Sequence, residues 1–124
     1  MSQTPFSLEE VEHPLAHVIA VSGEIDVASA PSIRTAIAHA RHAGCERLVI
    51  DLCRATFIDS AGLSALFGAW RRTREGGRMA IACSPGAVLH AVRDVGMEGV
   101  VPLFVSREAA LEQYARETAP SVLV

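Results

Sequence analysis

Residues 47–52 read RLVIDL, a nearly continuous apolar run of about the length of one strand. Such a run is typical of a strand that is buried on both faces, as in a parallel or mixed sheet. Helix-like segments lie on both sides of it. One begins at Ser29-Ala30-Pro31, where Ser29 is the candidate cap, and extends to about Ala43. The other begins at Ser60 and carries an apolar stripe, namely Leu63, Leu66, Phe67 and Trp70. The run and its neighbours therefore predict an α/β fold.

Four further segments have the apolar composition and the turn-residue boundaries of strands: 6–11, 17–22, 79–83 and 100–105. A turn at His13-Pro14 joins the first two, which predicts a hairpin. We expect Gly23–Asp26 to break the second strand. Loops at 23–29 and 56–62 then follow the second and third strands, at the edge of the sheet where α/β proteins gather their functional groups.

Two more helices are expected towards the C-terminus. One is capped by Ser84-Pro85 and closed by Gly96, and the other is capped by Ser106. Their inward residues are expected to be Val88, Leu89, Val92, Val95, Leu111 and Tyr114. The whole pattern predicts one domain over 1–124, with a core at about 6–116 and a tail at 117–124. This domain is expected to contain a mixed, mostly parallel sheet of about five strands with about four helices.

Charge and composition restrict the partners of the chain. The formal net charge is −3, and the eleven basic residues are all arginine and are spread along the sequence. A nucleic-acid partner would need a basic face, so it is not expected. The short cluster Arg71, Arg72 and Arg74 is interpreted as a solvated helix face.

The cysteines and the N-terminus favour a cytoplasmic protein. Cys45, Cys53 and Cys83 are odd in number and lack C-x-x-C spacing, so neither a disulfide framework nor a metal site is expected. We interpret them as buried or half-buried thiols in a reducing compartment. The N-terminus has no basic segment followed by an apolar stretch, and no apolar run approaches the length of a membrane span.

The segment Phe57–Leu63 reads FIDSAGL and places an Asp-Ser pair at the start of a helix. A helix N-terminus accommodates an added anion such as phosphate, which makes Ser60 a candidate for modification as well as for capping. If the second and third strands are neighbours, Asp26 lies beside Asp59 and Ser60 at the carboxyl ends of these strands, the edge of the sheet that we call the rim. A purely structural interpretation remains open, in which Asp26 ends a strand and Asp59 settles the first helical turn.

Catalysis by the chain itself finds little support. The G-x-S-x-G elbow of serine hydrolases is half missing around Ser60, where Ile58 precedes and Gly62 follows. No nucleotide-binding glycine loop occurs, and no metal-ligand pair is formed by the five histidines, His13, His17, His39, His42 and His90. We therefore expect no catalytic residues and no cofactor, and a phosphate on Ser60 would have to come from a partner.

The chain resembles the STAS domains, and within them the bacterial anti-sigma factor antagonists. Gly23–Asp26 with Ala30-Pro31 is similar to the first signature of the family, and 48–52 followed by Phe57–Leu63 is similar to the second. Further matches are Gly76-Gly77, Ser84-Pro85, Val95-Gly96-Met97 and Pro102-Leu103-Phe104. The order and spacing of these pieces extend the resemblance from Val18 to Leu111.

This resemblance implies a protein that binds an anti-sigma factor and so releases a sigma factor. By the same resemblance, the anti-sigma factor is expected to be a serine kinase with a histidine-kinase-like ATP fold. Ser60 matches the phosphoacceptor that the kinase modifies and a serine phosphatase resets. The implied partner-binding residues are Gly23, Asp26, Ser29, Asp59, Ser60, Ala61, Gly62 and Leu63. Ala61 replaces a hydroxyl that many relatives carry, which leaves Ser60 as the only hydroxyl in the turn, and Ser64 replaces a common Gly.

Two other functions remain as alternatives. In the first, the chain would be a STAS scaffold of a transport or signalling assembly, and Ser60 would only cap a helix. In the second, the chain would be a small hydrolase that uses Ser60. Neighbouring genes for a permease would favour the scaffold. The hydrolase would require an esterase activity that Ser60→Ala abolishes.

Overall fold

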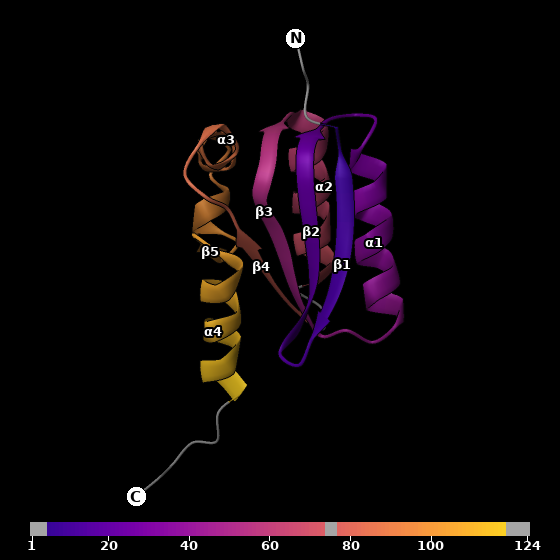
Figure 1. The fold of residues 1–124 in the computed structure, drawn as a ribbon, viewed down its shortest axis with the longest axis vertical. Coiled ribbons are helices and arrows are strands. Elements are labelled where there is room, and N and C mark those ends of the chain that lie inside the picture. Colours follow the sequence, from indigo (N-terminus) through magenta and orange to yellow (C-terminus); the bar gives the residue numbers. More distant parts are fainter. Residues whose placement is uncertain (1–4, 74–76, 119–124) are drawn as a thin grey trace, which may run out of the picture.

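The computed structural model describes residues 5–73 and 77–118 and contains strands and helices in alternation (Figure 1). The elements in chain order are β1 (Ser7–His13), β2 (Ala16–Ile25), α1 (Ala30–His42), β3 (Arg47–Ile58), α2 (Ser60–Thr73), β4 (Arg78–Ala82), α3 (Ala87–Asp94), the 3-10 helix η1 (Met97–Gly99), β5 (Leu103–Phe104) and α4 (Arg107–Thr118). The expected α/β class is confirmed.

The five strands form one sheet whose spatial order equals their order in the chain, β1-β2-β3-β4-β5. β1 pairs antiparallel with β2, and the other neighbours pair in parallel. The expected mixed, mostly parallel sheet with a hairpin at one edge is therefore confirmed. β3 lies at the centre, as its apolar sequence predicts.

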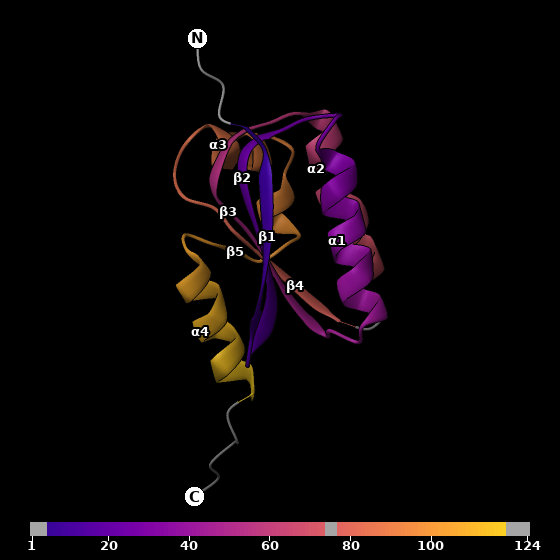
Figure 2. The same ribbon diagram turned by 45° about the vertical axis from the view of Figure 1, so that its right-hand side comes forward.

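Helices cover both faces of the sheet, with α1 and α2 on one side and α4 on the other (Figure 2). Because side chains alternate along a strand, successive residues of β3 serve two cores. Leu48 and Ile50 belong to the cluster that α1, α2 and α3 complete, while Val49 packs with Leu111 and Tyr114 of α4. Leu111 and Tyr114 are buried, as predicted.

The ends of β2 and β3 were not predicted correctly. β2 does not break at Gly23 but continues to Ile25, and β3 runs to Ile58 instead of ending at residue 52. The two strands pair in parallel from His17↔Leu48 to Ile25↔Ile58, with two register irregularities on the way. Gly23 lies next to one of them and has φ +85°, a backbone conformation that glycine adopts without strain. Pairing between the strands, rather than apolar composition, carries both of them to the rim.

The C-terminal half also differs in detail from the prediction. Ser84-Pro85 does not cap α3, which begins at Ala87 after Gly86, and Val95 is 47% exposed. β5 has only two residues, because Val100 and Val101 donate their backbone N–H groups to the carbonyl O of Met97 and so belong to the turn that closes η1.

The last helix confirms one prediction and corrects another. Ser106 caps α4, since its Oγ accepts a hydrogen bond from the backbone N of Ala109 at 3.1 Å. The helix includes residues 117 and 118, which were expected in the tail. Arg74, Gly76 and residues 119–124 of the tail lie outside the described residues. None of the described helices is long and apolar enough to cross a membrane.

Candidate functional site

The site lies where β2 and β3 end side by side. Ile25 and Ile58 are paired, so Asp26 and Asp59 follow them at the same edge of the sheet. The backbone N of Asp59 donates to the carbonyl O of Ile25 at 3.1 Å, which joins the two loops directly. The expectation that Asp26 and the Asp59-Ser60 pair share one rim is therefore confirmed.

Asp59, not Ser60, caps α2. Its Oδ1 accepts from the backbone N of Ala61 at 2.9 Å and of Gly62 at 3.2 Å, and its carbonyl O accepts from the N of Leu63. These bonds satisfy free N–H groups at the helix start, which is the work of an N-cap residue. The predicted capping role of Ser60 is wrong, because the carboxylate one position earlier already occupies the N-cap site.

Ser60 is the first residue of α2 and is exposed. Among the hydrogen bonds of the described residues, none involves its hydroxyl. The side chain therefore has no part in holding the local fold together. It is a hydroxyl offered to solvent beside a carboxylate that is partly exposed.

Asp26 shapes the loop between β2 and α1. Its Oδ1 accepts from the backbone N of Ala28 at 3.0 Å and of Ser29 at 3.1 Å. The Ser29 hydroxyl accepts from the N of Asp26 at 2.8 Å and donates to the carbonyl O of Glu24 at 3.1 Å. Ser29 makes no side-chain capping bond to α1, contrary to expectation, because the loop engages its hydroxyl instead. The loop is thus held by reciprocal bonds.

Glycine at position 62 permits the close approach of α2 to the strand ends. A Cβ on Gly62 would lie 2.7 Å from Ile25 Cγ2 and 2.7 Å from Ile58 Cγ1. Any side chain there would push the helix start away from the two residues that precede Asp26 and Asp59. Gly62 therefore sets the distance between Ser60 and the rim.

The eight predicted partner-binding residues divide by exposure. Gly23, Ser29 and Gly62 are buried, so they shape the rim without presenting a side chain to a partner. Ser60 is exposed, and the partly exposed members are Asp26, Asp59, Ala61 and Leu63. Of the eight predicted residues, these five present side chains to a partner.

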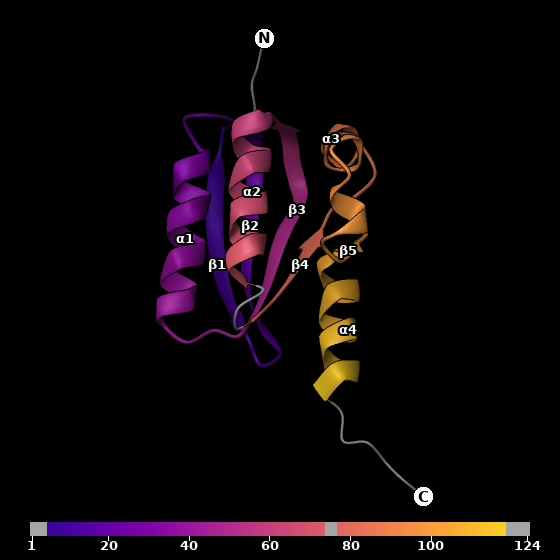
Figure 3. The same cartoon turned by 180° about the vertical axis from the view of Figure 1, so that it is seen from behind.

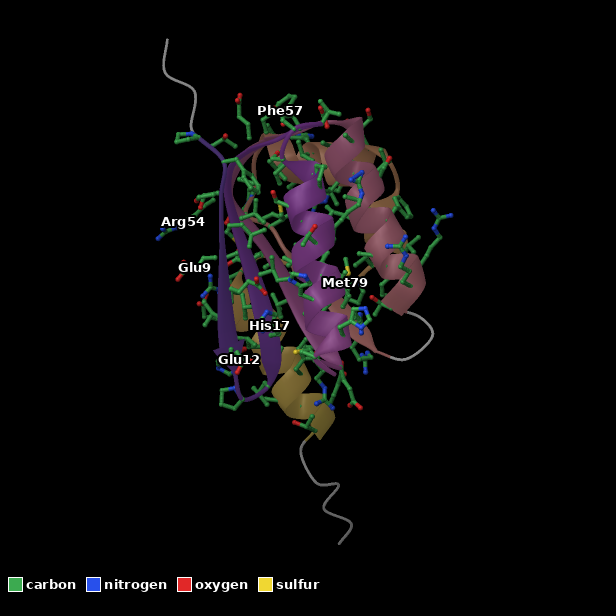
Figure 4. All side chains as sticks on the ribbon, turned by 90° about the vertical axis from the view of Figure 1, so that its right-hand side faces the viewer. Glu9, Glu12, His17, Arg54, Phe57 and Met79 are labelled. Atoms are coloured by element: carbon green, nitrogen blue, oxygen red, sulfur yellow. The ribbon has the colours of Figure 1, made fainter. Side chains whose placement is uncertain are left out.

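Two apolar residues of the rim are exposed although the sequence does not identify them as surface residues. Val27 is 75% exposed directly after Asp26, and Phe57 is 46% exposed near the end of β3. Figure 4 shows Phe57 at the end of the molecule where β3 meets α2. Large exposed apolar side chains next to carboxylates are typical of a surface that a partner covers. No local pattern in the sequence distinguishes them from buried apolar residues.

The histidines and cysteines do not assemble reactive sites. His17 pairs with Glu10 at 2.8 Å at the other end of β2, and within 5–73 and 77–118 no group of three metal-binding side chains is found. Burial raises the pKa of the Cys83 thiol to about 11 and also raises that of Cys53, which disfavours the reactive thiolate. All three thiols are free and are buried or partly buried, as expected.

Known proteins of the same fold are similar to most of the chain. The model of the STAS domain family matches residues 7–110. An anti-sigma F factor antagonist of Paenibacillus polymyxa is 27% identical over 109 residues, which cover 86% of this chain and 92% of the relative. The crystal structure of an anti-sigma factor antagonist from Mycobacterium paratuberculosis superposes with a TM-score of 0.83, at 27% identity and coverage of 90% of this chain and 95% of that chain.

The fold also occurs outside that group. A sulfate transporter family protein from Wolinella succinogenes superposes with a TM-score of 0.69 at 15% identity, covering 86% of this chain and 89% of the other. The match to the family model extends over most of the chain and includes all five strands, the helices α1, α2 and α3, and the rim. This chain therefore belongs to the STAS domain family.

Proposed function

We propose that this chain is an anti-sigma factor antagonist that binds an anti-sigma factor serine kinase and is released when that kinase phosphorylates Ser60. The names of two relatives at 27% identity support the first part. The observation that carries the second part is that different residues provide the cap and the free hydroxyl at the start of α2. Asp59 makes the capping bonds, while the exposed hydroxyl of Ser60 has no hydrogen-bond partner among the described residues.

The proposed partner surface consists of Asp26, Val27, Phe57, Asp59 and Ser60. It combines two carboxylates with two exposed apolar side chains. Apolar contacts contribute affinity when a partner covers them, and the carboxylates contribute specificity for a partner of opposite charge. A phosphate on Ser60 would add about −1.5 to −2 charges to this already acidic surface.

The proposed switch acts on the complex. The helix N-terminus tolerates an anion, so the fold is expected to survive phosphorylation. A partner that has desolvated the rim would face added repulsion, and a loss of ~3 kcal/mol weakens binding about a hundredfold. A serine phosphatase would restore binding. Because sigma factors act on the transcription machinery, the proposal places the chain in the cytoplasm.

The test uses the intact chain, its cognate anti-sigma kinase and ATP, with intact-mass and peptide mass spectrometry. Ser60→Ala is expected to abolish incorporation of phosphate. Ser64→Ala is the matched control, because Ser64 is also exposed and lies one turn further along α2. Phosphate that still appears on Ser60→Ala, or that disappears in Ser64→Ala alone, would refute the assignment of the acceptor.

A binding measurement separates the switch from mere docking. Ser60→Asp is expected to fold normally and to bind the kinase about a hundredfold more weakly than the wild type, whereas Ser64→Asp changes little. If Ser60→Asp binds as tightly as the wild type, the phospho-switch is wrong and a constitutive interaction module, as in a transport or signalling assembly, becomes the better hypothesis. If neither form binds the kinase, the antagonist function itself fails.

A further inference from the structure

The two helices on one face of the sheet are strongly basic. α1 and α2 together contain four arginines and two histidines and no acidic residue: Arg34, Arg41, Arg71, Arg72, His39 and His42. The whole chain nevertheless has a formal net charge of −3. Residues that are spread along the sequence are therefore concentrated by the fold in one layer, where α1 and α2 lie side by side (Figure 3).

A groove of about 480 Å³ lies between α1 and α2. Its apolar wall includes Ile37, Ala65 and Ala69, which are almost fully buried. The groove exists because α2 presents short side chains there. A Cβ placed on Gly68 would meet no other atom within 4 Å, so this position opens into free space. The volume lies within the range of ~300–1,000 Å³ that is typical of small-molecule sites.

Cations line the edge of the groove. Arg34, Arg41 and Arg72 all contribute to its lining. Arg41 donates to the neutral hydroxyl of Thr73, and burial lowers the pKa of its guanidinium, as expected for a cation that loses water without gaining a carboxylate. Neither Arg34 nor Arg72 forms an ion pair with any acidic group of the described residues. These guanidinium groups therefore provide donors that suit a carboxylate.

We propose that this groove binds a small amphipathic anion, a carboxylate on an aliphatic chain of about ten carbons. The apolar wall would take the chain and the arginines would take the carboxylate. An acidic helix of a partner protein is a poorer occupant, because one turn of a helix about 10 Å across already fills ~400 Å³. The site is independent of the proposed function, since it concerns the sides of α1 and α2 and its test requires no kinase.

The first test measures binding of decanoate to the intact chain by titration calorimetry and by amide NMR shifts. Binding with a Kd below about 1 mM is expected, with the largest shifts around Gly68. Decyltrimethylammonium has the same tail with the opposite charge and is expected not to bind. No binding of decanoate, equal binding of the cation, or shifts confined to another part of the chain would each overturn the proposal.

Two pairs of variants locate the site. Gly68→Leu fills the groove and is expected to weaken decanoate binding at least tenfold. Gly99→Leu is the control, because it adds the same side chain at another glycine with open space, and it is expected to leave decanoate binding unchanged. Ser64→Leu fills the same groove from the adjacent turn and replaces Gly68→Leu if that variant folds poorly. Unaltered binding in the folded groove-filling variant refutes the site.

The charge of the edge is tested in the same way. Arg34→Gln/Arg72→Gln is expected to reduce affinity at least tenfold and to leave decanol binding unaffected. Arg54→Gln/Arg116→Gln removes two charges from exposed arginines elsewhere, and Arg54 lies on the side of the sheet away from α1 (Figure 4). Equal losses in both double variants would show a general charge effect and refute the carboxylate site. Tighter binding of an acidic helical peptide than of decanoate would favour a protein occupant instead.

Discussion

Glycine 62 holds the start of α2 against the ends of the two central strands, and its replacement by alanine tests this arrangement. The added Cβ would lie 2.7 Å from carbon atoms of both Ile25 and Ile58. Favourable contacts between carbon atoms occur at about 3.5–4.0 Å, so the new methyl group is roughly 1 Å too close on two sides. Both isoleucines are buried and cannot move outward freely.

The expected loss follows from two opposing terms. Overpacking of this kind costs about 1–3 kcal/mol, while alanine in place of glycine in a helix gains at most about 1 kcal/mol. Gly62→Ala is therefore expected to lower the free energy of unfolding by ~1–2 kcal/mol. Gly68→Ala is the matched control on the same helix, where the Cβ meets nothing within 4 Å and a gain of about 0.5–1 kcal/mol is expected.

Urea unfolding monitored by circular dichroism measures both variants, because a single domain of this size is expected to unfold in one cooperative step. The midpoints should move in opposite directions with an unchanged slope, and the two free energies should differ by ~2 kcal/mol. A Gly62→Ala protein as stable as Gly68→Ala would show that α2 can shift without penalty. The close packing of the helix on the rim would then not explain the glycine.

Two further predictions concern hydrogen bonds. Asp59→Ala removes both capping bonds and is expected to cost ~1 kcal/mol of unfolding free energy, whereas Ser60→Ala changes it by less than about 0.5 kcal/mol; the reverse order in urea unfolding would contradict the assignment of the cap. The buried Tyr114 hydroxyl donates to the carbonyl O of Leu48 at 3.0 Å, and burial raises its pKa to about 12. Since the raised pKa favours the neutral form in the folded state, its contribution is complete below pH ~10 and is lost between about pH 10 and 12, by ~2–3 kcal/mol. Tyr114→Phe should be ~1 kcal/mol less stable below pH 10 and should lack this additional loss in a pH series of urea unfolding.

Much of the fold was predictable because local patterns agree with it. The apolar run at 47–52, the periodicity of the helices and the cap at Ser106 each correspond to an element of the structure. Strand ends were less predictable, since β2 and β3 extend to the rim through pairing with one another. The carboxylate of Asp51 within the apolar run accepts from the backbone N of Cys53 at 3.0 Å and from Nε of Arg107 at 2.9 Å, and Arg107 lies 56 residues further along the chain.

The candidate site was predictable in position but not in detail. The sequence places Asp59 and Ser60 at a helix start, and a one-residue difference in where the helix begins decides which of them is the cap. The exposure of Val27 and the groove between α1 and α2 depend on tertiary packing, for which no local pattern exists. Arginines spaced along two helices look dispersed until the helices lie side by side.

The separation of the cap from the hydroxyl has an electrostatic consequence for the proposed switch. In water, two like unit charges 4 Å apart repel by about 1 kcal/mol. A helix N-terminus stabilises an added anion by about 0.3–1 kcal/mol. A phosphate on Ser60 beside the Asp59 carboxylate would therefore leave the free protein nearly unchanged in stability. When a partner displaces water and the effective dielectric constant falls to about 20, the same repulsion rises to ~4 kcal/mol. Phosphorylation would then lower the affinity of the complex with almost no effect on the stability of the free protein. The affinity for a partner that leaves the rim hydrated would change little.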